Sequence, residues 1–147
     1  MKKSYLVILF TLMSFCAIAS DALFYSVNNI HGLSIRDTNS ICKDKNGFIW
    51  TSSKSAILRV TDSDYRIYKL PFTTADVFSI KLVYRNDNLY AYSNNGQVFM
   101  YDDIYDRFDL ILDIRPVVGS NNIVIVQMIV DRDEGLWLAT TMGLYLY

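Results

Sequence analysis

The sequence predicts an all-β protein, an incomplete β-propeller of about three four-stranded blades that follows an N-terminal signal peptide. Three observations support this fold class. The composition favours strands, because Val, Ile, Tyr, Phe and Thr are frequent and 14% of the residues are aromatic. A pattern of about 40 residues recurs along the chain. The first residues have the layout of a cleavable export signal.

Length and charge exclude several classes of protein. The 147 residues leave room for one ordinary domain at most. Lys and Arg number 14 against 15 Asp and Glu, so the chain lacks the basic surface that nucleic acid binding requires. The aromatic content, with 11 Tyr, argues against disorder.

Residues 1–20 are predicted to be a signal peptide, which leaves residues 21–147 as an exported, periplasmic chain. Lys2 and Lys3 precede an apolar run, and the small residues at 17 and 19 form a cleavage site. The alternative is an uncleaved membrane anchor, although the apolar run is short for a membrane span, which needs about 20 residues. Cleavage leaves Cys42 as the one cysteine, so we expect no internal disulfide, and we expect its thiol to be buried like a small apolar side chain rather than reactive.

The repeat is clearest in two segments that share an aspartate and a tryptophan. Asp44 precedes Trp50 by six positions, and Asp131 precedes Trp137 by the same spacing. A weaker copy lies between them, with Tyr90 in the tryptophan position. An apolar run that ends at Asp, followed by a turn and a second apolar run, predicts a β-hairpin in each unit.

Glycines mark two turns in each unit. Gly47 follows the first aspartate, whereas Gly135 sits one position later in the third unit, which allows a different turn there. A hydroxyl followed by glycine marks the second turn, as with Thr140 and Gly143, and Gly96 takes the same place in the middle unit. Each of these turns predicts another strand after it.

A fourth strand is predicted at residues 65–70 and at residues 107–112. Pro71 and Pro116 follow these strands, where a blade would end. Four short strands in about 40–45 residues are typical of a propeller blade, and the alternative is a β-sandwich whose hairpins are similar by chance. The predicted blades are residues 24–71, 72–116 and 117–147.

These residues resemble a known repeat. His31-Gly32-Leu33-Ser34, followed by Asp44 and Gly47-Phe48-Ile49-Trp50, is similar to the opening of the two-component regulator propeller repeat. The third unit resembles it more closely. Such repeats form the exported sensor region of hybrid two-component histidine kinases, and the resemblance covers about residues 24–147.

The resemblance implies a role in sensing an extracytoplasmic ligand such as an oligosaccharide. It also implies two kinds of protein partner: the remaining blades of a longer chain, and a second copy in a homodimer. Tyr84 and Tyr90 depart from the Asp and Trp of the family pattern. Three blades are fewer than the four to eight of closed propellers, so we expect the N-terminal part of a longer sensor, without a signalling output, that self-associates when expressed alone.

No catalytic residue, metal site or cofactor is predicted, and the ligand-binding residues cannot be identified from the sequence. His31 is the single histidine, which excludes Ser-His-Asp triads and His-rich zinc sites. The acidic segments 102–109 and 131–134 are interpreted as solvated turns, and Trp50 and Trp137 as core residues between blades. The alternative functions are a fragment of an exported propeller enzyme, sialidase-like or lyase-like, and a structural interaction propeller.

Overall fold

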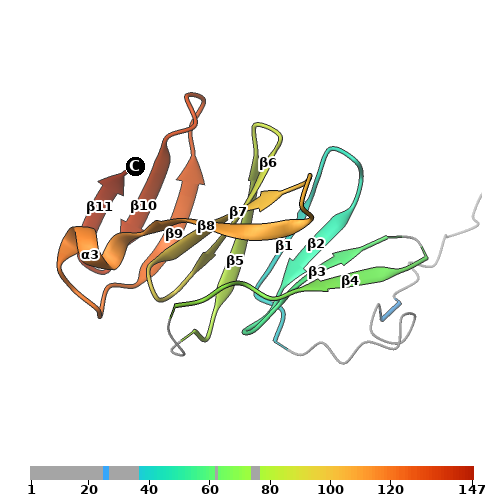
Figure 1. Cartoon of the computed structure of the whole chain (residues 1–147), viewed down its shortest axis with the longest axis horizontal. Coiled ribbons are helices and arrows are strands. Elements are labelled where there is room, and N and C mark those ends of the chain that lie inside the picture. Colours follow the sequence, from blue (N-terminus) through green and yellow to red (C-terminus); the bar gives the residue numbers. More distant parts are fainter. Residues whose placement is uncertain (1–24, 27–36, 62, 74–76) are drawn as a thin grey trace, which may run out of the picture.

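The computed structural model describes residues 25–26, 37–61, 63–73 and 77–147, and these form three antiparallel sheets (Figure 1). The all-β fold predicted from the sequence is confirmed. The first sheet contains β1 (Ser40–Lys43), β2 (Ile49–Ser52), β3 (Ile57–Val60) and β4 (Tyr65–Tyr68). The second contains β5 (Ile80–Arg85), β6 (Asn88–Ser93), β7 (Gln97–Asp102) and β8 (Arg107–Asp113). The third contains β9 (Ile125–Val130), β10 (Leu136–Thr140) and β11 (Gly143–Leu146).

Each sheet is a meander in which consecutive strands pair. The orders are β1-β2-β3-β4, β5-β6-β7-β8 and β9-β10-β11, and each sheet falls within one of the predicted blade ranges. The first strands lie side by side, because β1 packs against β5 and β5 packs against β9 (Figure 1). Three sheets that meet along their first strands are the arrangement of propeller blades.

Two features differ from the sequence expectation. The third sheet has three strands rather than four within the part of the chain that the structure describes. A short helix that the sequence did not predict, α3 (Ile114–Val118), follows β8, and Pro116, which comes after that strand as predicted, lies in the first turn of the helix. A first-turn proline is tolerated because its missing N–H would have no partner within the helix. Asp113 caps this helix by accepting a hydrogen bond from the Arg115 backbone N–H at 3.1 Å.

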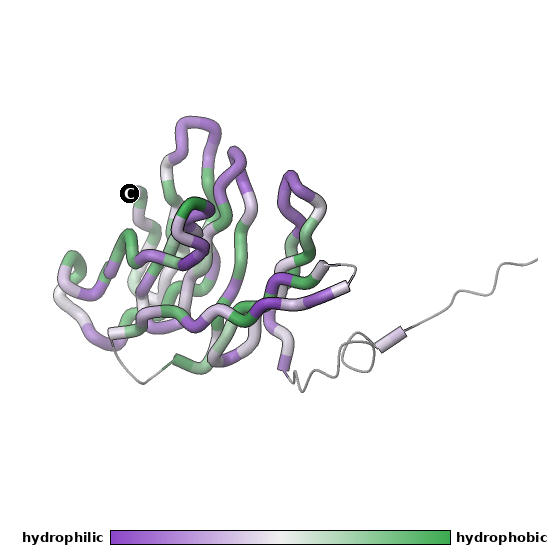
Figure 2. The backbone as a smooth tube through the Cα atoms, turned by 45° about the vertical axis from the view of Figure 1, so that its right-hand side comes forward, coloured by the Kyte–Doolittle hydropathy of each residue, from purple (hydrophilic) through white to green (hydrophobic). Residues whose placement is uncertain are grey.

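Apolar side chains fill the space between neighbouring sheets in two separate clusters. Trp50 and Ile57 of the first sheet meet Phe99 and Phe108 of the second. On the other face of the second sheet, residues that include Tyr90 meet side chains of the third. Hydrophobic residues therefore concentrate in the strands, while the turns are hydrophilic (Figure 2). The predicted signal peptide and His31 lie outside the described residues.

Candidate functional site

Two of the three first hairpin turns are held by an aspartate that also binds a tryptophan. Asp44 Oδ1 accepts hydrogen bonds from the backbone N–H groups of Asn46 (2.9 Å) and Phe48 (3.0 Å). Asp44 Oδ2 accepts one from Trp50 Nε1 at 2.7 Å. The carboxylate thus fixes both the turn and the ring, which explains why the aspartate and the tryptophan recur at a constant spacing.

The third sheet repeats this arrangement. Asp131 accepts hydrogen bonds from the backbone N–H groups of Asp133 (2.9 Å) and Gly135 (2.8 Å) and from Trp137 Nε1 (2.9 Å). The Trp137 hydrogen bond, aided by the two backbone ones, lowers the pKa of Asp131. The shifted glycine does not produce a different turn, because Glu134 takes the left-handed conformation (φ 66°) that Gly47 takes in the first sheet (φ 89°).

The middle unit forms its turn differently. Asn86 and Asp87 both have positive φ, at 50° and 63°, and make a two-residue turn between β5 and β6. Tyr84, in the aspartate position, uses its hydroxyl to accept a hydrogen bond from the Lys45 backbone N–H at 3.1 Å and to donate one to Asp87 at 3.3 Å. Tyr84 therefore joins the first two hairpin turns to each other.

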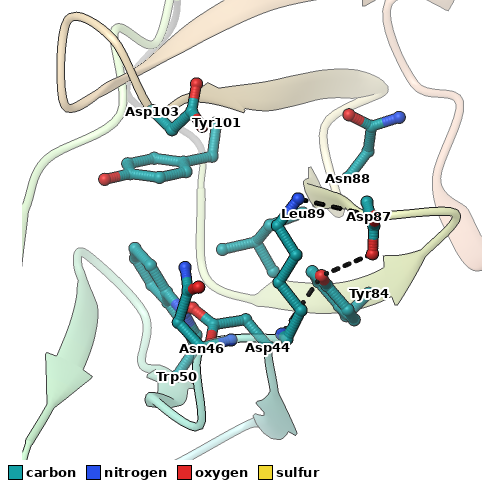
Figure 3. A pocket seen from close by; sticks show the side chains of 10 residues that line it. Asp44, Asn46, Trp50, Tyr84, Asp87, Asn88, Leu89, Tyr101 and Asp103 are labelled. Atoms are coloured by element: carbon teal, nitrogen blue, oxygen red, sulfur yellow. Dashed lines mark hydrogen bonds and ion pairs between the residues drawn. The ribbon is translucent and has the colours of Figure 1, made fainter.

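A pocket of about 230 Å³ lies where these two turns meet the β7–β8 turn (Figure 3). We call it the inter-blade pocket, because both the first and the second sheet line it. Its residues come from the β1–β2 turn, from β2, β5, β6 and β7, and from the β5–β6 and β7–β8 turns of the second sheet. They are Asp44, Lys45, Asn46, Trp50, Tyr84, Asp87, Asn88, Leu89, Tyr101 and Asp103.

The inter-blade pocket is lined by both hydrogen-bond donors and hydrogen-bond acceptors. Lys45 Nζ pairs with Asp87 Oδ2 at 3.4 Å, and both side chains are more than half exposed. Asp103 is exposed and lines the same pocket. The side chains of Asn46 and Asp103 lie on opposite walls of the pocket in Figure 3. Carboxylates, amides and an ammonium group together both accept and donate hydrogen bonds.

Trp50 is part of the core and does not offer a stacking surface in this pocket. It is 1% exposed. Its ring centroid lies 5.3 Å from that of Tyr68 and 4.8 Å from that of Tyr101, and the Arg59 guanidinium lies 5.5 Å from it. Trp137 has the same aspartate contact but is half-buried, because no described sheet covers its outer face. The predicted core position therefore fits Trp50, which is fully buried, and fits Trp137 only in part.

A second polar centre, which the sequence did not reveal, lies beneath the pocket. Asp106 accepts hydrogen bonds from the hydroxyls of Tyr68 (2.7 Å) and Tyr101 (2.5 Å). Arg59 and Arg66 form ion pairs with the same carboxylate. Burial, and next the neighbouring Tyr101 hydroxyl, raise the pKa of Tyr68 to about 12. The interpretation of segment 102–109 as a solvated turn is wrong for Asp106, because its side chain is about three-quarters covered and joins both sheets.

A buried polar cluster lies at the opposite ends of the second-sheet strands. Gln97 is fully buried, and its Nε2 donates to Thr73 Oγ1 at 2.7 Å while its Oε1 accepts from Asn95 Nδ2 at 3.2 Å. Arg115 Nη2 also donates to Thr73 Oγ1, at 2.7 Å. The cluster ties the β4–β5 connection to the second sheet. The hydrogen bonds that Arg115 makes lower the pKa of Asp113 beside it.

Cys42 is half-buried against the first core rather than fully buried. Burial, and next the charge of Asp44, raise the pKa of its thiol to about 11, so the thiol stays protonated at neutral pH. No group of three or more His, Cys, Asp or Glu side chains among the described residues could hold a metal ion. No helix in the same part of the chain is long and apolar enough to cross a membrane.

Solved structures of other proteins have a similar fold. No protein-family model matches the chain, and no curated protein matches it by sequence. Among solved structures, it is similar to the extracellular domain of BT4673 from B. thetaiotaomicron, which is assigned as a hybrid two-component system. The identity is 18%, the TM-score is 0.69, and the match covers 88% of this chain and 17% of that one. A second structure of that domain, assigned there as a one-component system, gives the same values.

The extracellular domain of BT3049 from the same organism, also assigned as a hybrid two-component system, is similar over 73% of this chain and 16% of that chain. Its identity is 16% and its TM-score 0.54. The chain therefore spans less than a fifth of the length of these extracellular domains. This likeness agrees with the resemblance found in the sequence motifs. The chain has the fold found in the extracellular domains of hybrid two-component systems.

Proposed function

We propose that this chain is an extracytoplasmic ligand-sensing segment of the hybrid two-component type, and that it responds to an oligosaccharide. The observation that carries the proposal is the fold shared with extracellular domains of hybrid two-component systems over 88% of the chain. The Asp–Trp units, which resemble sensor propeller repeats, support it independently. In this proposal the chain is exported to the periplasm and contributes binding rather than catalysis.

The inter-blade pocket is the site we assign to the ligand. Asp103 and Asn46 are exposed and offer side-chain hydrogen-bonding groups, and Asp87 is more than half exposed. Sugar hydroxyls both donate and accept hydrogen bonds, so they can satisfy carboxylates and amides together. Because Trp50 is covered, binding would rest on these polar groups rather than on stacking against that ring.

A ligand in this pocket would contact two sheets at once. Asn46 belongs to the first sheet's turn, whereas Asp87 and Asp103 belong to turns of the second. A ligand shifts a conformational equilibrium only if it binds one arrangement of the two sheets more tightly than the other. A ligand that bridges the first two hairpin turns would bind more tightly when the turns are close. It would therefore favour that arrangement of the two sheets.

The test is isothermal titration calorimetry of the purified chain with a panel of short oligosaccharides. Asp103→Asn removes one exposed carboxylate from the pocket, and we expect it to weaken binding about tenfold, the effect of losing one charge-assisted hydrogen bond. Asp133→Asn removes an equivalent charge from the third-sheet turn and should leave binding unchanged. Binding that is insensitive to Asp103→Asn would refute the assignment of the ligand to this pocket. A fully inert panel, together with no response of the host cells to these sugars, would refute oligosaccharide sensing.

Export is tested at the N-terminus. Mass spectrometry of the mature chain should find a new N-terminus at Ser20 or Asp21, as the small-x-small pattern before it predicts. Recovery of an intact Met1 chain from the membrane fraction would instead show that the segment is an anchor.

A further inference from the structure

Positive charge is concentrated where the fourth strands of the first two sheets, β4 and β8, border a hollow of about 470 Å³. This hollow shares no lining residue with the inter-blade pocket, and we call it the outer hollow. Arg66 on β4, Lys69 just after that strand and Arg107 on β8 line it. Two carboxylates, Asp106 and Asp109, line it as well.

Two arginines that share one carboxylate supply part of this charge. Arg59 and Arg66 lie directly opposite each other on β3 and β4. Like charges at opposite positions of a sheet repel each other, so an anion between them is needed to stabilise the pair. Asp106 pairs with both guanidinium groups, and its Oδ1 lies 3.5 Å from Arg59 Nη1. One carboxylate balances one of the two cations, so this group of three keeps a net positive charge.

The hydroxyl groups beside Asp106 do not change this balance. Tyr68 and Tyr101 donate hydrogen bonds to the carboxylate, and the raised pKa of Tyr68, about 12, keeps its hydroxyl neutral. Asp106 therefore already has two hydroxyl and two guanidinium partners. A guanidinium carries five N–H donors, and the Arg66 side chain is 57% exposed, so it can bind a further acceptor.

The β8 side of the outer hollow carries a guanidinium that is held in a similar way. Arg107 Nε pairs with Asp109 Oδ1 at 2.9 Å, and the arginine side chain is 61% exposed. Its guanidinium lies 5.1 Å from the ring of Tyr105, as that of Arg66 lies 5.5 Å from the ring of Tyr68. Stacking on an aromatic ring orients each guanidinium in advance, which lowers the entropic cost of binding a ligand there.

We propose that the outer hollow binds an oxyanion, the carboxylate or sulfate group of a small acidic ligand, through Arg66, Lys69 and Arg107. With Arg59, the cations of this region exceed its two carboxylates by two charges, although basic residues do not outnumber acidic ones in the whole chain. Guanidinium groups present paired N–H donors that match two oxygens of an oxyanion, and the exposed Lys69 adds a third positive charge to the site. The inference does not rest on the proposed function, because it concerns other residues and requires no oligosaccharide.

The experiment is NMR of the arginine side chains in the isotope-labelled chain during titration with sodium sulfate, sodium acetate or sodium glucuronate. Sodium chloride keeps the ionic strength constant, because salt also screens exposed charges in general. The Nε–H signals of Arg66 and Arg107 should shift and saturate, whereas Arg132, an exposed arginine of the third-sheet turn, should not respond in this way. Saturation by sulfate alone would assign the site to sulfate groups, and saturation by both carboxylates would assign it to carboxylate groups. Tighter binding of glucuronate than of acetate would assign it to an acidic sugar.

Charge variants make the test specific to the outer hollow. Lys69→Gln should weaken anion binding about fivefold, the effect of losing one exposed charge contact, whereas Lys69→Arg should bind as the wild-type chain does. Arg107→Gln should weaken binding at least as much, because it also leaves Asp109 without its cation. Arg132→Gln removes an exposed charge elsewhere and should leave binding unchanged, and backbone amide spectra confirm that each variant is folded. Shifts that rise linearly with all three anions, an equal response of Arg132, or an unchanged affinity in Lys69→Gln would each overturn the proposal.

Discussion

At the scale of single residues, the position three residues after each turn aspartate requires a left-handed backbone conformation. Gly47 occupies it in the first sheet and Glu134 in the third, both with positive φ. A residue with a Cβ adopts this conformation at a cost of about 1 kcal/mol, while glycine does so freely. The sequence suggested that Gly135 serves the third turn, but that glycine has another role: a Cβ there would lie 2.7 Å from Asp131 Oδ2.

This difference predicts opposite effects of two substitutions. Glu134→Gly should raise the free energy of unfolding by about 1 kcal/mol, because it removes the cost of a side chain at positive φ. Gly47→Ala should lower it by about the same amount. Urea denaturation of both variants and the wild-type chain measures the two effects. A destabilised Glu134→Gly chain would show that the Glu134 side chain contributes more than its backbone conformation costs.

The hydrogen bonds to Asp131 predict a pH dependence. Its folded-state pKa lies below the unfolded value, so the ionised carboxylate stabilises the fold above the ordinary carboxyl pKa of about 4. That stabilisation is lost as the pH falls through the lowered pKa. The difference in unfolding free energy between the wild-type chain and Asp131→Asn should therefore shrink as the pH is lowered from neutral, as followed by thermal melts. A difference that is constant with pH would contradict this.

At the scale of elements, the hairpins are local structures and could be predicted from the sequence. The Asp44–Trp50 and Asp131–Trp137 contacts join residues six positions apart, and the turns between them carry recognisable residues. The inter-blade pocket, Asp106 and Gln97 could not be found in this way. The partners of Asp106 include Tyr68, which is 38 positions away, and Gln97 binds Thr73 24 positions away. Such distant pairs leave no periodic signal in the sequence.

The two tryptophans should differ in what they contribute to stability. Trp50→Ala should lower the free energy of unfolding by about 3–5 kcal/mol, because the ring is fully buried between two sheets. Trp137→Ala should cost about half as much, since no described sheet covers its outer face. Denaturation of the wild-type chain and of each variant makes the comparison. Equal costs would contradict the difference in burial between the two rings.

At the scale of the whole molecule, the sheets are held in register by contacts between blades. The hydroxyl of Ser40 on β1 accepts a hydrogen bond from the Leu82 backbone N–H at 3.1 Å, and Ser52 on β2 donates one to the Ile80 carbonyl at 2.6 Å. Lys81 on β5 donates one to the Val126 carbonyl on β9 at 2.9 Å. These bonds lie along the inner strands, while the aromatic cluster lies farther out. Through these contacts the three sheets pack as successive propeller blades.

The most direct test of that claim is a double-mutant cycle across the first interface. Trp50 and Tyr101 lie on different sheets with ring centroids 4.8 Å apart at 62°, an edge-to-face geometry. The free energies of unfolding of the wild-type chain, Trp50→Leu, Tyr101→Leu and the double variant give their coupling energy. Blade packing predicts a coupling of about 1 kcal/mol, the value typical of aromatic pairs. Effects that add to within about 0.3 kcal/mol would show that the two rings do not meet, and would contradict the packing of the blades.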